Sequence, residues 1–159
     1  MAERSETRDF KGIVERAYKF DMSQVLDRYE KETRLPEDAI AEHEREIKRF
    51  LAMCSYRPGK YGMRGPLDEL WHTFIIFTEK YQNFCTALGG NFIHHYPVIH
   101  KEGAHAQRDP KTAYKDFLRD YEELFGEKPA KHLWPGAGGG VMDPSCSDCG
   151  AGCDHKCLV

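Results

Sequence analysis

The sequence lacks three features that would each assign it to a familiar class of protein. No run of apolar residues approaches the ~18 needed to cross a membrane, and no apolar signal-peptide segment follows Met1. Basic residues are not in excess, since 23 Lys and Arg stand against 26 Asp and Glu and the net charge is −3. These absences predict a cytoplasmic protein that binds neither membranes nor nucleic acid.

Cysteine is scarce in the body of the chain. Of the six cysteines, only Cys54 and Cys85 lie before residue 146. A disulfide scaffold would spread its cysteines over the whole fold, and reduced thiols are expected in a cytoplasmic protein. Because Cys54 and Cys85 fall within apolar helical patterns, we expect them to pack as inert core thiols.

Helical spacing is present through most of the chain. Apolar residues recur at i, i+3, i+4 and i+7 in segments near residues 10–17, 22–29, 36–54, 67–88 and 110–125. The segment 67–88 is apolar over much of its circumference, which is typical of a central, buried helix, and two glycines end it. The pattern predicts an all-α domain of about five helices packed around this central helix, with a short extended insert at residues 91–100.

Three helix starts carry local signals. Asp21 with Gln24 three positions later is typical of a capping box. Pro36 is a favoured first residue of a helix. Asp109 followed by Pro110 is typical of an N-cap with proline at the first helical position.

The composition changes near residue 135. Residues 136–145 read GAGGGVMDPS, which is typical of a flexible linker. We therefore predict a helical domain over residues 1–135 and a flexible glycine- and cysteine-rich tail over residues 136–159. The tail contains four cysteines spaced C-x2-C-x3-C-x3-C, namely Cys146, Cys149, Cys153 and Cys157.

Two interpretations of this tail are open. Four nearby thiolates can surround one soft metal ion. The spacing nevertheless differs from the usual zinc patterns and from the ferredoxin pattern. The alternative is a disordered, redox-sensitive tail.

Histidines gather on and after the predicted central helix. Asp68 and His72 are spaced i, i+4, so their side chains can meet on one helix face. The glycine turn can bring His94 and His95 back alongside that face. Neighbouring side chains of an extended segment point in opposite directions, so we expect one of the two, His95 or else His94, to face His72. Together with Asp68 they would form a two-His, one-carboxylate site for Zn(II) or Fe(II).

A purely structural interpretation of these residues is also open. Asp68 can stabilise the helix dipole from the first turn, and a buried histidine can tie the following loop to the helix. Glu79 is a further candidate ligand, with a solvated charge as the alternative. His43 lies on the apolar stripe of the third helix, and we expect it to be a hydrogen-bonded core histidine rather than a ligand.

The glycine- and proline-rich loop 55–66 carries three cations, Arg57, Lys60 and Arg64. Such groups can recognise a carboxylate or phosphate. The loop lacks the pattern of a phosphate-binding P-loop, and a solvated connection is the alternative interpretation.

The segment DELWHTFIIFTEKYQNFCTALGGNFIHHYP (residues 68–97) resembles the glycine-rich-domain-containing-protein-like family, which is largely uncharacterised. The similar positions are an Asp-x-x-Trp-His helix, a Tyr-x-x-Phe-Cys continuation, a glycine turn and a His-His pair before proline. The resemblance extends over roughly residues 10–135. It implies an all-helical domain and carries no established reaction.

The leading hypothesis is a small cytoplasmic metal-binding protein with its site at Asp68, His72 and His95. An open coordination position would allow such a site to act as a metalloenzyme, but the sequence does not decide whether the protein is an enzyme. One alternative is a metal-free protein-interaction module with structural histidines. Another is a metal-handling or redox protein that acts through its C-terminal cysteines. The sequence identifies no small-molecule or protein partner.

Overall fold

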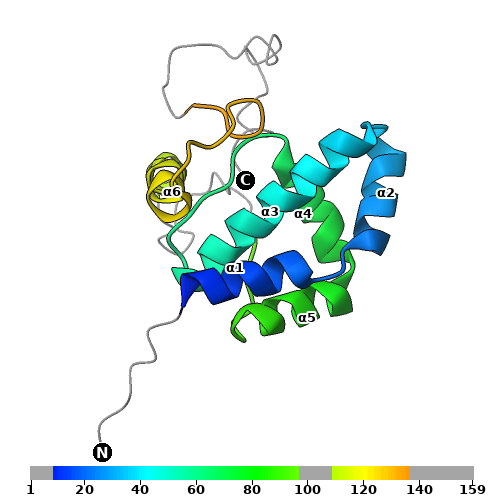
Figure 1. Cartoon of the computed structure of the whole chain (residues 1–159), viewed down its shortest axis with the longest axis horizontal. Coiled ribbons are helices and arrows are strands. Elements are labelled where there is room, and N and C mark those ends of the chain that lie inside the picture. Colours follow the sequence, from blue (N-terminus) through cyan, green and yellow to red (C-terminus); the bar gives the residue numbers. More distant parts are fainter. Residues whose placement is uncertain (1–8, 97–108, 137–159) are drawn as a thin grey trace, which may run out of the picture. The chain divides into compact units, whose positions relative to one another are not determined.

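The fold is built from α-helices. The computed structural model describes residues 9–96 and 109–136. In chain order its helices are α1 (Phe10–Lys19), α2 (Ser23–Thr33), α3 (Glu37–Tyr56), α4 (Leu67–Ile76), α5 (Thr78–Leu88) and α6 (Pro110–Phe125) (Figure 1). The described residues contain no strand, so the predicted all-α class is confirmed.

The helices are divided between two compact units. The first unit contains the described residues 9–58 and 73–93, and the second contains residues 59–72, 94–96 and 109–136. The helices α1, α2, α3 and α5 therefore belong to the first unit, and α6 belongs to the second. Helix α4 is shared, because it contributes residues 67–72 to the second unit and residues 73–76 to the first.

In the first unit, α1 packs against α3 and α5, and α2 packs against α3 (Figure 1). Asp9 starts α1 because its carboxylate accepts hydrogen bonds from the backbone N–H groups of Lys11 and Gly12, both at 3.2 Å. The core side chains follow the predicted helical spacing and include Ile13, Ala17, Val25, Tyr29, Ile47, Phe50 and Phe84.

The start of α2 differs from the prediction. The predicted capping box of Asp21 and Gln24 is not formed, because the helix begins at Ser23 with Met22 at the N-cap position and no side-chain cap bond. The Asp21 carboxylate lies one position too early and accepts a hydrogen bond from the Ser23 backbone N–H at 2.9 Å. That bond lowers the pKa of Asp21.

The predicted central helix consists of two helices. Helix α4 ends at Ile76, α5 begins at Thr78, and Phe77 lies between them with non-helical dihedral angles (φ −78°, ψ 67°). The break falls in the sequence Ile75-Ile76-Phe77-Thr78, whose β-branched and aromatic side chains lose rotamer freedom in a helix. A single helical spacing therefore does not extend from residue 67 to residue 88.

In the second unit, α6 begins and ends as the sequence predicts. The Asp109 carboxylate accepts from the Thr112 backbone N–H at 3.1 Å, Pro110 is the first helical residue, and Gly126 ends the helix with a φ of 69°. The ring of Trp134 packs on Phe117 of α6 with 4.6 Å between centroids. The buried Trp134 side chain thereby anchors the segment 128–135 to α6.

Within the described residues, no helix is both long and apolar enough to cross a membrane. The proposed boundary between a helical domain ending at residue 135 and a tail over 136–159 stays a prediction, because residues 137–159 lie outside the described part of the chain.

Candidate metal centre

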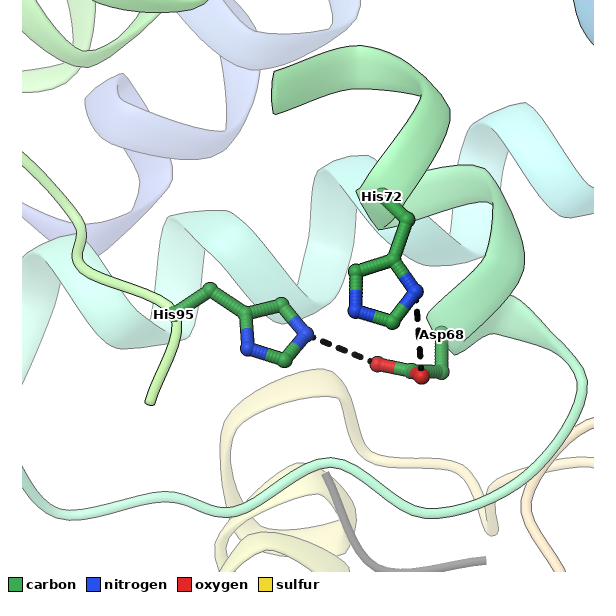
Figure 2. Close-up of side chains that lie close together, drawn as sticks. All are labelled: Asp68, His72 and His95. Atoms are coloured by element: carbon green, nitrogen blue, oxygen red, sulfur yellow. Dashed lines mark hydrogen bonds and ion pairs between the residues drawn. The ribbon is translucent and has the colours of Figure 1, made fainter. Parts of the chain in front are cut away.

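Asp68, His72 and His95 form a cluster of three side chains, the Asp/His/His cluster (Figure 2). Asp68 and His72 are one turn apart on α4, and His95 lies in the non-helical segment after α5. The Asp68 carboxylate faces both rings: Oδ1 is 2.9 Å from His95 Nε2, and Oδ2 is 3.4 Å from His72 Nδ1. All three residues belong to the second unit.

The hydrogen bond between Asp68 and His95 has a defined direction. An ionised carboxylate can only accept, so His95 Nε2–H donates to Oδ1. The cluster is buried on one side and open on the other, because the side chains of His95 and Asp68 are 7% and 12% exposed and that of His72 is 51% exposed. The side of the cluster at His72 is therefore the side that is open to solvent.

The His95 ring contacts two neighbouring aromatic rings. Its centroid lies 4.2 Å from that of Trp71, at an interplanar angle of 36°, and 4.6 Å from that of His72, with which it stacks at 21°. Trp71 is buried and precedes His72 on α4. These two ring contacts and the hydrogen bond from Nε2 to Asp68 orient the His95 side chain.

The cluster contains the donor atoms of a metal site. One ligand atom from each residue can be chosen so that all three lie within 4.8 Å of one another. Ligands about 2.0–2.2 Å from a zinc ion lie roughly 3.4 Å apart in a tetrahedron, so an ion would draw the widest pair together. The half-exposed His72 side chain has room to make this adjustment.

Residues 11–131 match the UCP032817-like family. The chain belongs to that family. The name of the UCP032817-like family states no reaction and no ligand. No curated protein and no solved structure gives a significant match to the chain. The matched range includes Asp68, His72 and His95 and ends before the four C-terminal cysteines.

Membership of the UCP032817-like family corrects the resemblance drawn from the sequence. The glycine-rich-domain-containing-protein-like family is the wrong assignment, because the family that matches over residues 11–131 is a different one. The motifs quoted for the resemblance lie within residues 68–97, and it was extended from there over roughly residues 10–135. Short motifs from two helices and a turn have too few fixed positions to distinguish one helical family from another.

The structure distinguishes between the two adjacent histidines. His94 is exposed and lies outside the cluster, with its ring 5.9 Å from that of Tyr96. His95 is the one that faces His72, as expected from the alternation of side chains in an extended segment.

Two further candidate ligands have other surroundings. Glu79 is exposed in the first turn of α5, after the break at Phe77, and lies outside the Asp/His/His cluster. His43 is buried and its Nδ1 lies 2.9 Å from the Tyr29 hydroxyl, which confirms the expected hydrogen-bonded core histidine.

The body cysteines are packing residues. Burial raises the pKa of both Cys54 and Cys85, which disfavours the reactive thiolate. Both are free thiols. The other four, Cys146, Cys149, Cys153 and Cys157, lie outside the described residues, so their proposed metal site stays a prediction.

Trp71 has a role at the cluster that the sequence did not predict. Its place on the apolar stripe predicts a core residue, which is correct, but not its packing on His95. The position of Trp71 directly before His72 was the one signal in the sequence that it lies near the cluster. The contact of Trp71 with His95 depends on the path of the chain after α5.

Proposed function

We propose that this protein binds one divalent metal ion through Asp68, His72 and His95. The observation that carries the proposal is the convergence of a carboxylate and two imidazoles from separate segments, with ligand atoms within 4.8 Å of one another. Two imidazoles and one carboxylate suit Zn(II) or Fe(II) better than Mg(II) or Ca(II), which prefer oxygen ligands.

The unequal burial of the cluster supports an ion that remains accessible. Three protein ligands would leave at least one position for water or a substrate, and the half-exposed His72 side chain would allow solvent to reach it. An ion held in this way could polarise a bound carbonyl or phosphoryl oxygen or activate a water molecule. These are the reactions open to the site, and no single one is favoured by the geometry.

Metal binding through Nε2 requires the proton on this nitrogen to move. The His95 Nε2–H that donates to Asp68 must shift to the other ring nitrogen before Nε2 can bind an ion. A histidine protonated on both ring nitrogens has no lone pair for a metal, so we expect the metal affinity to fall as the pH is lowered.

The second candidate function is a metal-free interaction module with structural histidines. It is favoured by the same 2.9 Å hydrogen bond, which ties the segment after α5 to α4. In this case Asp68 and His95 stabilise the fold, and the exposed His72 has no essential role.

Elemental analysis of the full-length protein, after loading with Zn(II) or Fe(II) and removal of unbound ion, separates these functions. The proposal predicts about one equivalent of metal, lost in His72→Ala and retained in the matched variant His94→Ala. Since His72 is half exposed and His94 is exposed, both variants should fold. Retention of the metal in His72→Ala would contradict the proposal.

The same assay tests the C-terminal cysteines. A fourfold variant replaces the tail cysteines by serine in the full chain, at Cys146, Cys149, Cys153 and Cys157. If the ion is held by Asp68, His72 and His95, this variant should still bind about one equivalent of metal. Loss of the metal only in this fourfold variant would instead indicate a protein that handles metal through its tail.

A further inference from the structure

The basic loop before α4 contains one cation that differs from its neighbours. The guanidinium of Arg57 lies over the Tyr56 ring at 5.4 Å, and Lys60 Nζ lies 2.7 Å from Asp120 Oδ2. Arg64 is partly buried, and its Nε is buried without any hydrogen-bond partner. Among residues 9–96 and 109–136, no other buried side-chain nitrogen or oxygen is left in this condition.

Tight packing on both sides holds Arg64 in place. Met63 is buried. Gly65 has a φ of +108°, and a Cβ at this position would lie 2.7 Å from the Leu133 carbonyl oxygen and 2.8 Å from the Pro135 ring. The backbone around Arg64 is therefore fixed against the segment 133–135, within the second unit.

Arg64 also affects the buried side chain of Tyr114. Burial raises the pKa of the Tyr114 hydroxyl, and the positive charge of Arg64 opposes that increase. The hydroxyl itself donates to the Pro135 carbonyl oxygen at 2.6 Å. Arg64 therefore lies close enough to this buried hydroxyl for its charge to act on it.

A buried N–H without an acceptor costs free energy, and a guanidinium cannot lose its charge to avoid that cost. A carboxylate or phosphate satisfies such a group well, because two of its oxygens can accept from Nε–H and an adjacent Nη–H in parallel. An oxyanion is therefore the ligand that best complements Arg64.

We propose that Arg64 binds the carboxylate or phosphate group of a small molecule. This anion site uses none of the three proposed metal ligands and does not depend on a bound metal ion.

Isothermal titration of the full chain at constant ionic strength tests the proposal, with inorganic phosphate and acetate as separate probes. We expect saturable one-site binding of at least one probe, weakened at least about tenfold in Arg64→Gln. The tighter probe identifies a phosphate or a carboxylate as the natural group. The matched control is Arg28→Gln, because Arg28 is an exposed arginine that pairs with Glu32 at 2.8 Å, and this variant should bind as the wild type does.

Absence of saturable binding of both probes, or equal binding by Arg64→Gln, would overturn the proposal and indicate that a buried water satisfies Nε. If circular dichroism shows that Arg64→Gln is unfolded, Arg64→Lys replaces it. Lysine keeps the positive charge but lacks the two parallel donors, so binding of the anion probe should still weaken. Metal content measured on the same samples keeps the two proposals apart, since Arg64→Gln should retain its metal and Asp68→Asn should retain anion binding.

Discussion

Two histidines with largely buried side chains, one in each unit, have partners of different chemistry. His43 in the first unit lies 2.9 Å from the Tyr29 hydroxyl. His95 in the second unit lies 2.9 Å from the Asp68 carboxylate, which also faces His72. Burial and hydrogen-bond length are similar at the two positions, so neither property distinguishes a core histidine from a candidate ligand.

The difference lies in what surrounds each ring. The pair of Tyr29 and His43 joins α2 to α3 and contributes a single imidazole beside a neutral hydroxyl. The Asp/His/His cluster combines a charged oxygen ligand with two imidazoles, one of them open to solvent. A metal ion needs several donors and an access route, and only the cluster in the second unit has both among these two histidine sites.

The largest expected effect is on metal affinity when the carboxylate of the cluster is removed. Asp68→Asn keeps the shape of the side chain but loses its negative charge. We expect the dissociation constant for Zn(II), measured by competition with a chelator, to rise by at least about 100-fold, because even loss of an outer partner of a ligand costs 10- to 100-fold. Tyr29→Phe, the matched change at the other histidine, should leave the constant unchanged. Equal metal affinities in wild type and Asp68→Asn would remove the distinction between the two histidine sites.

The second prediction concerns stability in the first unit. Tyr29→Phe removes the hydroxyl beside buried His43, and we expect the free energy of unfolding to fall by about 1–3 kcal/mol. Urea denaturation of the metal-free protein measures this change. The control is Tyr18→Phe, at an exposed tyrosine whose hydroxyl accepts from Arg49 Nε at 2.7 Å. Because that bond is exposed to water, the loss should be below about 0.5 kcal/mol. A similar loss in both variants would show that the bond between Tyr29 and His43 has no special structural role.

A third prediction tests how His95 is held. Trp71→Leu removes the ring packed on His95, and aromatic pairs contribute about 0.5–1.5 kcal/mol beyond their buried area. We therefore expect metal affinity to fall by roughly two- to tenfold. The control is Trp134→Leu, which removes a buried tryptophan of the same unit that packs on Phe117. The metal affinity of the folded fraction of this variant should not change. Equal metal affinity in wild type and Trp71→Leu would indicate that Trp71 only fills the core.

The smallest effect is expected for stability when the exposed member of the cluster is removed. His72→Ala removes a half-exposed imidazole whose Nδ1 lies 3.4 Å from Asp68 Oδ2, so the free energy of unfolding of the metal-free protein should change by less than about 1 kcal/mol. His95→Ala leaves the buried Asp68 carboxylate without its closer partner and should cost about 1–3 kcal/mol. The reverse order of costs in urea denaturation would mean that His72, not His95, stabilises this part of the fold.

Much of the helical fold could be predicted because local chemistry and burial agree. At α6, an N-cap aspartate, a proline at the first helical position and a C-terminal glycine mark the boundaries, and the apolar spacing marks the buried face. The break at Phe77 could not be predicted from the spacing, because apolar residues continue through it. The only sign of the break is the low helix propensity of Ile75, Ile76 and Thr78, which is a weak signal.

The candidate site was predictable to the extent that it depends on one helix. The spacing of Asp68 and His72 places both on one face of α4 without further information. The choice between His94 and His95 depends on how the segment after α5 is rotated, and a sequence does not specify that rotation. The unpartnered Nε of Arg64 was hidden for the same reason, because three cations in one loop look alike until their acceptors are known.

X-ray absorption spectroscopy at the metal edge of the zinc-loaded, full-length protein tests the metal site most directly. If Asp68, His72 and His95 hold the ion, the first shell consists of nitrogen and oxygen at about 2.0–2.2 Å, with the multiple-scattering pattern of two imidazoles and no sulfur. A shell dominated by sulfur at about 2.3 Å, or a protein that retains no zinc, would contradict the account.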